Sequence, residues 1–162
     1  MKIGVYSGSF DPLTKGHIEI LERSKGLVDK LIILVLNNPN KKYMFSLVER
    51  TEMIKKIFQE KKSIQVENYE GLLVDFMKKN KCNLIIRGLR AVSDYEYELG
   101  MALVNKDLSG GEIETVFLPA SREQMYISST MVREIALNGG KLEKYVDSSI
   151  ENKILEKLQT KK

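Results

Sequence analysis

The sequence offers little sulfur or imidazole chemistry, because its 162 residues include one cysteine, Cys82, and one histidine, His17. A single cysteine cannot form a disulfide within the chain, and one cysteine with one histidine cannot supply the four ligands of a usual structural zinc site. Disulfide scaffolds and structural zinc domains are therefore excluded. Cys82 stands before an apolar stretch, which predicts a small buried hydrophobe.

Long hydrophobic segments are also missing. The longest apolar run covers residues 31–36, whereas a membrane-spanning helix needs ~20 apolar residues. The first residues enter a strand-like pattern at once, without the apolar stretch of a secretory signal. We expect a cytoplasmic protein with no membrane contact.

The excess of positive charge is small. Lys and Arg number 26 against 22 Asp and Glu, a net charge of +4, and half of it lies in residues 151–162. Nucleic-acid binding favours basic residues clustered along one face, so we expect a small anionic ligand and no nucleic acid. Hydrophobic residues make up 43% of the chain, which excludes disorder and suits one domain spanning residues 1–162.

Strand-like and helix-like segments alternate along the chain. Apolar runs rich in β-branched residues predict five strands, at 2–6, 30–37, 64–69, 83–87 and 113–118. Helices are expected near 16–26, 47–60, 71–80, 94–107, 130–137 and 149–159. This alternation predicts an α/β fold with a doubly wound parallel sheet. The second and fourth runs are nearly continuous in hydrophobic residues, as in strands buried on both faces.

Three of the expected helices begin with a capping-box pattern, in which a serine is followed three residues later by glutamate. The patterns start at Ser46, Ser93 and Ser148. Each serine is predicted to cap the N-terminus of the helix that follows it.

The segment after the first strand has the properties of an anion site. Gly8 and Gly16 allow a ligand to approach the backbone closely, and His17 begins a helix whose N-terminal N–H groups favour phosphate. The spacing fits neither a Walker A loop nor a dinucleotide-binding G-x-G-x-x-G motif. A lone histidine is more often a solvated or capping residue, but its place at the ligand-binding end of the sheet favours a function.

Cations and hydroxyls follow the other strands. Lys41 and Lys42 come after the second strand, Arg87 and Arg90 after the fourth, and a hydroxyl-rich helix start at 128–130 after the fifth. Taken alone, these features are explained by a polar turn, by ion pairs and by helix capping. Together they lie at one edge of a parallel sheet, which predicts a phosphate-binding cleft.

No nucleophile–base pair accompanies these residues, since His17 has no second histidine beside it. Covalent catalysis is therefore disfavoured. Phosphoryl and nucleotidyl transfer need no protein nucleophile, because positioning and stabilisation of charge do most of the work.

The chain resembles the bacterial phosphopantetheine adenylyltransferases over essentially its whole length, in the motifs G-S-F-D-P (8–12), T-K-G-H (14–17), N-P-N-K-K (38–42), R-G-L-R (87–90) and I-S-S-T (127–130). The T-x-G-H motif alone indicates only the wider nucleotidyltransferase superfamily. The R-G-L-R motif, followed by D-Y-E-Y-E at 94–98 and then I-S-S-T, is much more specific.

This resemblance implies a Rossmann-like nucleotidyltransferase fold and transfer of AMP from ATP to 4′-phosphopantetheine, the penultimate step of coenzyme A biosynthesis. It further implies that the phosphate of the acceptor attacks the α-phosphorus in line and that His17 stabilises the transition state. The resemblance also implies Mg²⁺ held mainly by ATP phosphates and water, with no metal ligands from the protein. A homohexamer and inhibition by coenzyme A are implied as well.

By the same resemblance, phosphopantetheine is expected to contact Ser9, Lys41, Leu73 and Arg87. ATP is expected to contact Ser9, Phe10, His17, Gly88, Leu89, Arg90, Glu98, Gln124, Met125, Tyr126, Ile127, Ser128, Ser129 and Thr130. The chain departs from the family at Ser7, commonly Pro, at Ser9, commonly Thr, and at Gln124, where Trp is frequent. Ser9 retains the hydroxyl, whereas Gln124 is expected to alter affinity at the adenine site.

Two alternatives remain open. One is another adenylyl- or cytidylyltransferase of the superfamily, for example one that uses nicotinamide mononucleotide as the acceptor. The other is a non-catalytic nucleotide-binding module. Arg87–Arg90 and Lys41-Lys42 speak against the first alternative, and the joint presence of His17, Lys41, Arg87 and Arg90 speaks against the second.

Overall fold

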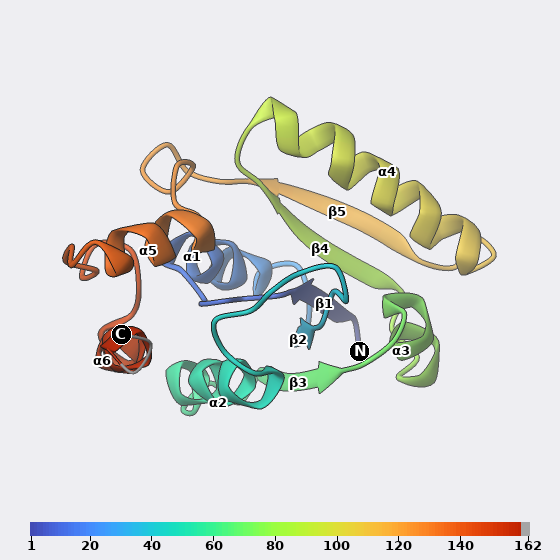
Figure 1. Cartoon of the computed structure of the whole chain (residues 1–162). Coiled ribbons are helices and arrows are strands. Elements are labelled where there is room, and N and C mark those ends of the chain that lie inside the picture. The colour runs from blue at the N-terminus through green and yellow to red at the C-terminus, as the bar shows by residue number, and fades with distance from the viewer. Residues whose placement is uncertain (160–162) are drawn as a thin grey trace.

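The computed structural model describes residues 1–159, so Lys161 and Lys162 of the basic tail lie outside the described residues. Five parallel strands form one sheet in the order β3-β2-β1-β4-β5 (Figure 1). The strands are β1 (Ile3–Gly8), β2 (Lys30–Leu36), β3 (Ile64–Tyr69), β4 (Leu84–Leu89) and β5 (Glu114–Pro119). The predicted α/β fold with a doubly wound five-stranded sheet is confirmed.

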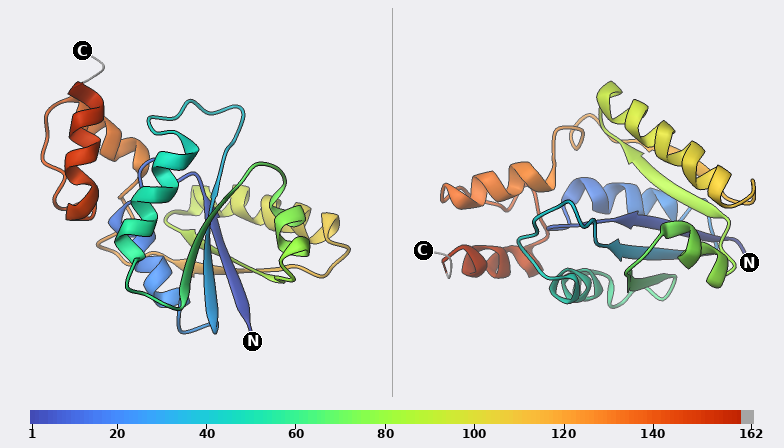
Figure 2. Two further views of the ribbon diagram at one scale, coloured as in Figure 1. Left: turned by 90° about the horizontal axis from the view of Figure 1, so that it is seen from below. Right: turned by 45° about the vertical axis from the view of Figure 1, so that its right-hand side comes forward.

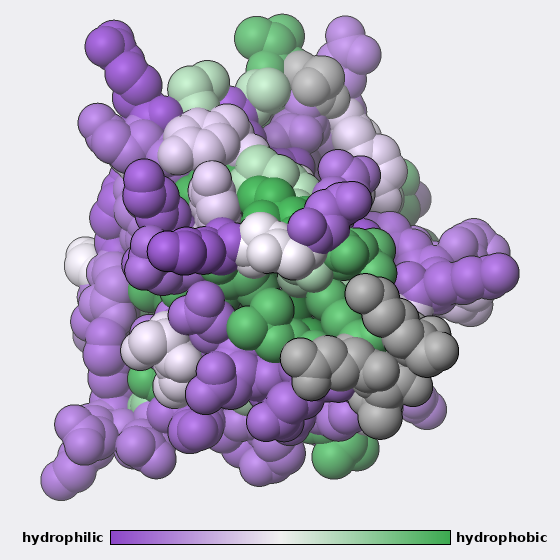
Figure 3. Space-filling model, turned by 60° about the vertical axis from the view of Figure 1, so that its left-hand side comes forward, coloured by the Kyte–Doolittle hydropathy of each residue, from purple (hydrophilic) through white to green (hydrophobic). Residues whose placement is uncertain are grey.

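Helices cover both faces of the sheet (Figure 2). They are α1 (Lys15–Ser24), α2 (Leu47–Phe58), α3 (Leu73–Lys79), α4 (Val92–Leu108), α5 (Ser129–Leu137) and α6 (Ser148–Gln159). α1 and α2 pack on one face, α3 and α4 on the other, and α6 contacts α2 and α5 beyond the sheet. On the face that carries α5 and α6, hydrophilic side chains surround a smaller hydrophobic area (Figure 3).

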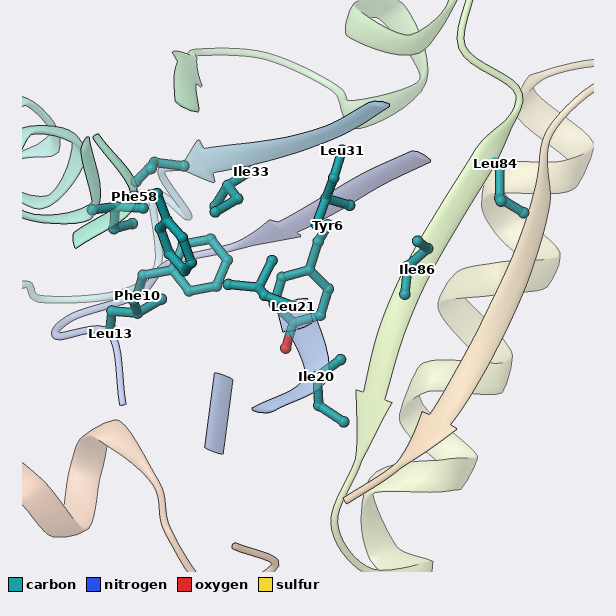
Figure 4. Close-up of a cluster of buried hydrophobic side chains, with 12 residues drawn as sticks. Tyr6, Phe10, Leu13, Ile20, Leu21, Leu31, Ile33, Phe58, Leu84 and Ile86 are labelled. Carbon is teal, nitrogen blue, oxygen red and sulfur yellow. The ribbon is translucent and has the colours of Figure 1, made fainter. Parts of the chain in front are cut away.

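Two hydrophobic cores lie on opposite faces because successive strand residues point to opposite sides of a sheet. Tyr6, Ile33 and Ile86 pack beneath α1 and α2 (Figure 4). Val5 and its neighbours pack against α3 together with Cys82, which is buried as predicted. Burial raises the pKa of the Cys82 thiol, so that it is unsuited to act as a nucleophile.

The fourth strand is buried over its hydrophobic residues and extends beyond the predicted run. Residues 31–35 of β2 are buried, but in β4 only Leu84, Ile85 and Ile86 are. The expected burial on both faces is therefore confirmed for these three residues, whereas Arg87, at the end of the predicted run, is only partly buried and the strand continues to Leu89. Arg87 and Gly88 in this stretch line an open cleft.

One of the three predicted caps is confirmed. Ser46 caps α2 in a complete capping box with Glu49. α4 begins at Val92, two residues before the predicted first helical residue, so the cap predicted at Ser93 is wrong. The cap predicted at Ser148 is also wrong, because a carboxylate supplies the contact: Asp147 accepts a hydrogen bond from the Ser149 N–H at 2.9 Å.

Within residues 1–159, no helix is both long and apolar enough to cross a membrane.

Candidate active site

The strand order changes direction at β1: β2 and β3 are added on one side of it, and β4 and β5 on the other. Ligands of such sheets bind beyond the carboxyl ends of the strands at this point. An open cleft of about 1130 Å³ lies there, and it extends from the segments after β1 and β2 to α4 and the start of α5. At this point β1 and β4 pair in parallel, with Gly4 beside Leu84 and Tyr6 beside Ile86.

Most of the residues assigned from the sequence meet in this cleft. Those lining it are Ser9, Phe10, His17, Lys41, Lys42, Leu73, Arg87, Gly88, Arg90, Glu98, Gln124, Ile127, Ser129 and Thr130. Leu89, Met125, Tyr126 and Ser128 do not line it. The Ser128 hydroxyl caps α5 by accepting a hydrogen bond from Met131, as the alternative explanation of this helix start predicted.

The loop between β1 and α1 is tightly folded around Phe10. Phe10 has a φ of +48°, in the left-handed region that most side chains avoid, and its ring is buried beside Tyr6 (Figure 4). A Cβ at Gly8 would lie 2.9 Å from this ring, so that glycine makes room for it. The backbone strain at Phe10 is thus held in place by packing at the mouth of the cleft.

Asp11, which sequence analysis did not single out, fastens this loop to the chain after β2. Its buried carboxylate accepts hydrogen bonds from the backbone N–H groups of Met44, at 2.8 Å, and Phe45, at 3.0 Å. Arg133 of α5 donates to the Asp11 carbonyl and also lines the cleft. In the sequence, nothing about Asp11 in the F-D-P motif indicates that it links these segments.

His17 is fixed by the residue that caps its helix. Its Nδ1 lies 3.1 Å from the Thr14 backbone nitrogen and 2.9 Å from the Thr14 hydroxyl. The ring stands edge-on to Phe10, with 5.3 Å between the centroids. Burial, reinforced by the positive charges of Arg90 and Arg87, lowers the pKa of His17 to about 3. The imidazole is therefore neutral at neutral pH.

Arg87 and Glu98, assigned to different substrates from the sequence, form one ion pair. The guanidinium donates from Nε and Nη2 to the two carboxylate oxygens, at 2.7 and 2.6 Å, and from Nη1 to Ser7. Together these contacts engage at most four of the five N–H groups of an arginine. Glu98 holds the plane of the guanidinium while at least one donor remains for a ligand.

Arg90 links α4 to the segment that precedes α5. Its Nε donates to Asp94 at 3.1 Å, and its Nη1 donates to the Ile127 carbonyl at 3.4 Å. The first contact ties the end of β4 to α4, and the second reaches the segment before α5. Arg90 is thereby positioned over the same cleft as His17.

Residues 38–42, here called the lysine turn, form the opposite wall. The side chains of Lys41 and Lys42 are exposed, and within residues 1–159 neither takes part in an ion pair. Tyr43 supports the turn, because its hydroxyl accepts a hydrogen bond from the Asn38 N–H at 2.6 Å. The same hydroxyl lies 3.4 Å from the hydroxyl of Ser9.

Arg50 is a second residue that sequence analysis missed. It is completely buried in α2, and within residues 1–159 its guanidinium donates only to uncharged oxygens. These are the carbonyls of Phe45, Ser9 and Leu36 and the side-chain oxygen of Asn37. Arg50 thus joins the loop after β1 to the segments on either side of the lysine turn. In the sequence it is one charged residue in an amphipathic helix, which does not distinguish it from a solvated one.

Gln124 has an unmet hydrogen-bonding requirement. It lines the cleft, and its Oε1 is the one buried side-chain polar atom without a hydrogen-bond partner in residues 1–159. A buried acceptor left in this way costs free energy. This is the position at which the resemblance described above leads us to expect an aromatic residue.

No group of three or more His, Cys, Asp or Glu side chains that is suited to a metal ion occurs in the part of the chain that the structure describes. The carboxylates at the cleft are committed elsewhere: Glu98 pairs with Arg87, and Asp94 with Arg90. The donor set therefore suits anionic phosphates better than a bare cation.

Comparison with known proteins identifies close relatives. Residues 5–135 match the cytidylyltransferase-like family. The chain is 53% identical over 150 residues to the phosphopantetheine adenylyltransferase of Fusobacterium nucleatum, covering 93% of this chain and 92% of that protein. It is 46% identical over 162 residues to the protein of the same name from Clostridium botulinum strain Hall, covering 100% and 98% of the two chains.

Solved structures show the same fold at much lower sequence identity. The Plasmodium falciparum nicotinic acid mononucleotide adenylyltransferase complexed with NaAD superposes with a TM-score of 0.70 and 16% identity, covering 99% of this chain and 95% of that one. At this identity the likeness establishes a common architecture and leaves the acceptor open.

Proposed function

The chain belongs to the phosphopantetheine adenylyltransferase family, and from this membership we propose that it transfers AMP from ATP to 4′-phosphopantetheine. The products are dephospho-coenzyme A and pyrophosphate. One observation supports this most strongly: a neutral histidine and several cations converge on one cleft.

The proposed chemistry is a direct displacement at phosphorus. An oxygen of the acceptor phosphate forms a bond to the α-phosphorus of ATP while the bond from that phosphorus to the bridging oxygen breaks. The electron pair leaves with pyrophosphate. An ionised phosphate needs no general base, so positioning and stabilisation of charge are the tasks left to the protein.

We assign His17 to the reacting α-phosphate, and the cations to the acceptor phosphate and to ATP. His17 donates a hydrogen bond to the charge that develops on the α-phosphate. Lys41 and Arg87 hold the acceptor phosphate, and Leu73 provides an apolar surface for its arm. Arg90 and the hydroxyl-rich start of α5 bind ATP.

We propose that Mg²⁺ accompanies ATP and is held by its phosphates and by water. The commitment of Glu98 and Asp94 to arginines fits this arrangement, since neither carboxylate is left unpaired. Bound Mg²⁺ would neutralise charge on the triphosphate.

We also propose that the chain assembles with copies of itself, as a homohexamer. The support lies in α4, which carries exposed large side chains at Val92, Tyr95, Tyr97, Leu99, Met101, Leu103, Val104 and Leu108. A helix of this kind is normally covered. Sedimentation equilibrium tests the proposal, and a monomer at micromolar concentration would contradict it.

Regulation and location follow from the substrates. Coenzyme A differs from the proposed product by one phosphate, so we propose that it competes for the same cleft as an inhibitor. Because ATP is the adenylyl donor, we propose that the reaction takes place in the cytoplasm.

Product identification tests the function directly. The protein is incubated with ATP, Mg²⁺ and either 4′-phosphopantetheine or nicotinamide mononucleotide, and adenylylated products are identified by mass. We expect kcat/KM to be far higher for phosphopantetheine. Preferential adenylylation of nicotinamide mononucleotide would overturn the assignment of the acceptor, and ATP binding without any product would favour a non-catalytic module.

A further inference from the structure

Thr14 makes two kinds of contact with the imidazole of His17. Its backbone nitrogen lies 3.1 Å from Nδ1, and its hydroxyl lies 2.9 Å from the same atom. The hydroxyl also accepts a hydrogen bond from the backbone N–H of His17, at 3.4 Å, as the N-cap of α1. Thr14 is fully buried, so water does not compete for these contacts.

These contacts determine which ring nitrogen carries the proton. A backbone N–H can only donate, so Nδ1 must present a lone pair to Thr14. The Thr14 oxygen already accepts from the His17 N–H, which leaves its hydroxyl proton free to point at Nδ1. A neutral imidazole whose Nδ1 is an acceptor carries its proton on Nε2.

We propose that Thr14 is a positioning residue that fixes His17 as the neutral Nε2–H tautomer, with this N–H as the donor to the reacting phosphate. The inference rests on the proposed function for the identity of that phosphate. In this role His17 donates a hydrogen bond throughout the reaction and transfers no proton.

The environment of the ring supports this assignment. No residue among 1–159 accepts a hydrogen bond from Nε2, and Nε2 is absent from the buried unpaired atoms, so it is open to the cleft. The charged groups that act on the ring, Arg90 and Arg87, are both cations and oppose a second proton. Phe10 covers the ring edge-on and limits its rotation.

Three substitutions separate the capping of α1 from the control of the tautomer. Thr14→Val keeps the shape and removes both hydroxyl contacts. In Thr14→Asp, a carboxylate oxygen can still accept the hydrogen bond from the His17 N–H and cap the helix. A carboxylate has no proton to donate to Nδ1, so it favours a proton on that nitrogen. Thr14→Ser retains the hydroxyl, and the capping box with it.

The readout is the ¹⁵N spectrum of selectively labelled histidine, which is unambiguous because the chain contains one histidine. The wild type should show an unprotonated Nδ1 and a protonated Nε2 from pH 8 to pH 5. Thr14→Asp should shift protonation toward Nδ1, with kcat lowered more than ~10-fold. Thr14→Val should lose ~5–10-fold in kcat, the size expected when the hydrogen bond to Nδ1 is lost. Thr14→Ser should keep the wild-type spectrum and the wild-type kcat.

Two results would overturn the proposal. One is a wild-type ring protonated on Nδ1. The other is a Thr14→Asp variant with wild-type spectrum and kcat, which would make Thr14 a helix cap only. If Thr14→Val fails to fold, Thr14→Asp and Thr14→Ser still decide the question. Because the spectrum needs no substrate, failure of the proposed function would appear separately, as absence of dephospho-coenzyme A from the wild type.

Discussion

The two walls of the cleft are built in opposite ways. Around His17, the supporting residues Phe10 and Thr14 are buried, and the ring is fixed by hydrogen bonds and an aromatic edge. In the lysine turn, the side chains of Lys41 and Lys42 project from an exposed segment without an ion partner in residues 1–159.

This difference corresponds to a division of labour. A donor to transition-state charge is effective only when it is already in place, because reorganising it during the reaction costs free energy. Attracting a charged substrate needs only cations of sufficient reach, and lysine is a flexible point charge. We therefore expect substitutions at the first wall to lower kcat and substitutions at the second to raise KM.

The largest effect should come from His17→Ala. Loss of the preorganised donor is expected to lower kcat by ~10²–10³, with the Kd for ATP changed by less than threefold. Stopped reactions at saturating substrates measure kcat, and calorimetry measures Kd. A variant with near-normal kcat and weak ATP binding would make His17 a ground-state binding residue.

Next in size should be a pair of opposite effects on affinity. Lys41→Ala is expected to raise KM for phosphopantetheine ~10-fold, and Arg90→Ala to raise KM for ATP by a similar factor, since each removes a charge-assisted contact. Calorimetry with one ligand at a time checks the assignment. If Lys41→Ala weakened ATP binding and Arg90→Ala weakened phosphopantetheine binding, the two substrates would have to exchange places.

A smaller gain is expected from Gln124→Trp. The substitution removes the unpaired Oε1 and supplies an aromatic surface. Stacking of this kind adds ~0.5–1.5 kcal/mol, so the Kd for ATP should fall by about two- to tenfold, with kcat little changed. Unchanged or weaker ATP binding would show that residue 124 does not contact the base.

The smallest effect is expected at the start of α2, where Glu49 completes the cap of the helix and pairs with Lys157. Lys157 and the Ser46 N–H lower the pKa of Glu49 to about 2 from 4.5. Its stabilising contribution is therefore present above pH 4.5 and is lost as the pH falls toward 2. Urea unfolding should show Glu49→Gln less stable by ~0.5–1 kcal/mol at pH 7, with a smaller difference at pH 3.5. An equal difference at both pH values would contradict this.

The sequence predicted the order of strands and helices better than the side-chain contacts that hold the loops of the cleft together. The five strands and the position of His17 follow from hydrophobic periodicity and glycine spacing, which are local properties of the chain. The roles of Arg50 and Asp11 were not predictable, because their partners lie on distant loops and both residues have the composition of solvated ones. The pairing of Arg87 with Glu98 was missed for the same reason: it depends on how α4 packs against β4.

The division of labour between the two walls is tested most directly by kcat/KM for phosphopantetheine in His17→Ala, Lys41→Ala and the double variant. The two residues share no partner in the structure, so their losses should multiply in the double variant, within about twofold. A double variant no slower than His17→Ala alone would show that the two walls act as one unit, and would contradict the account.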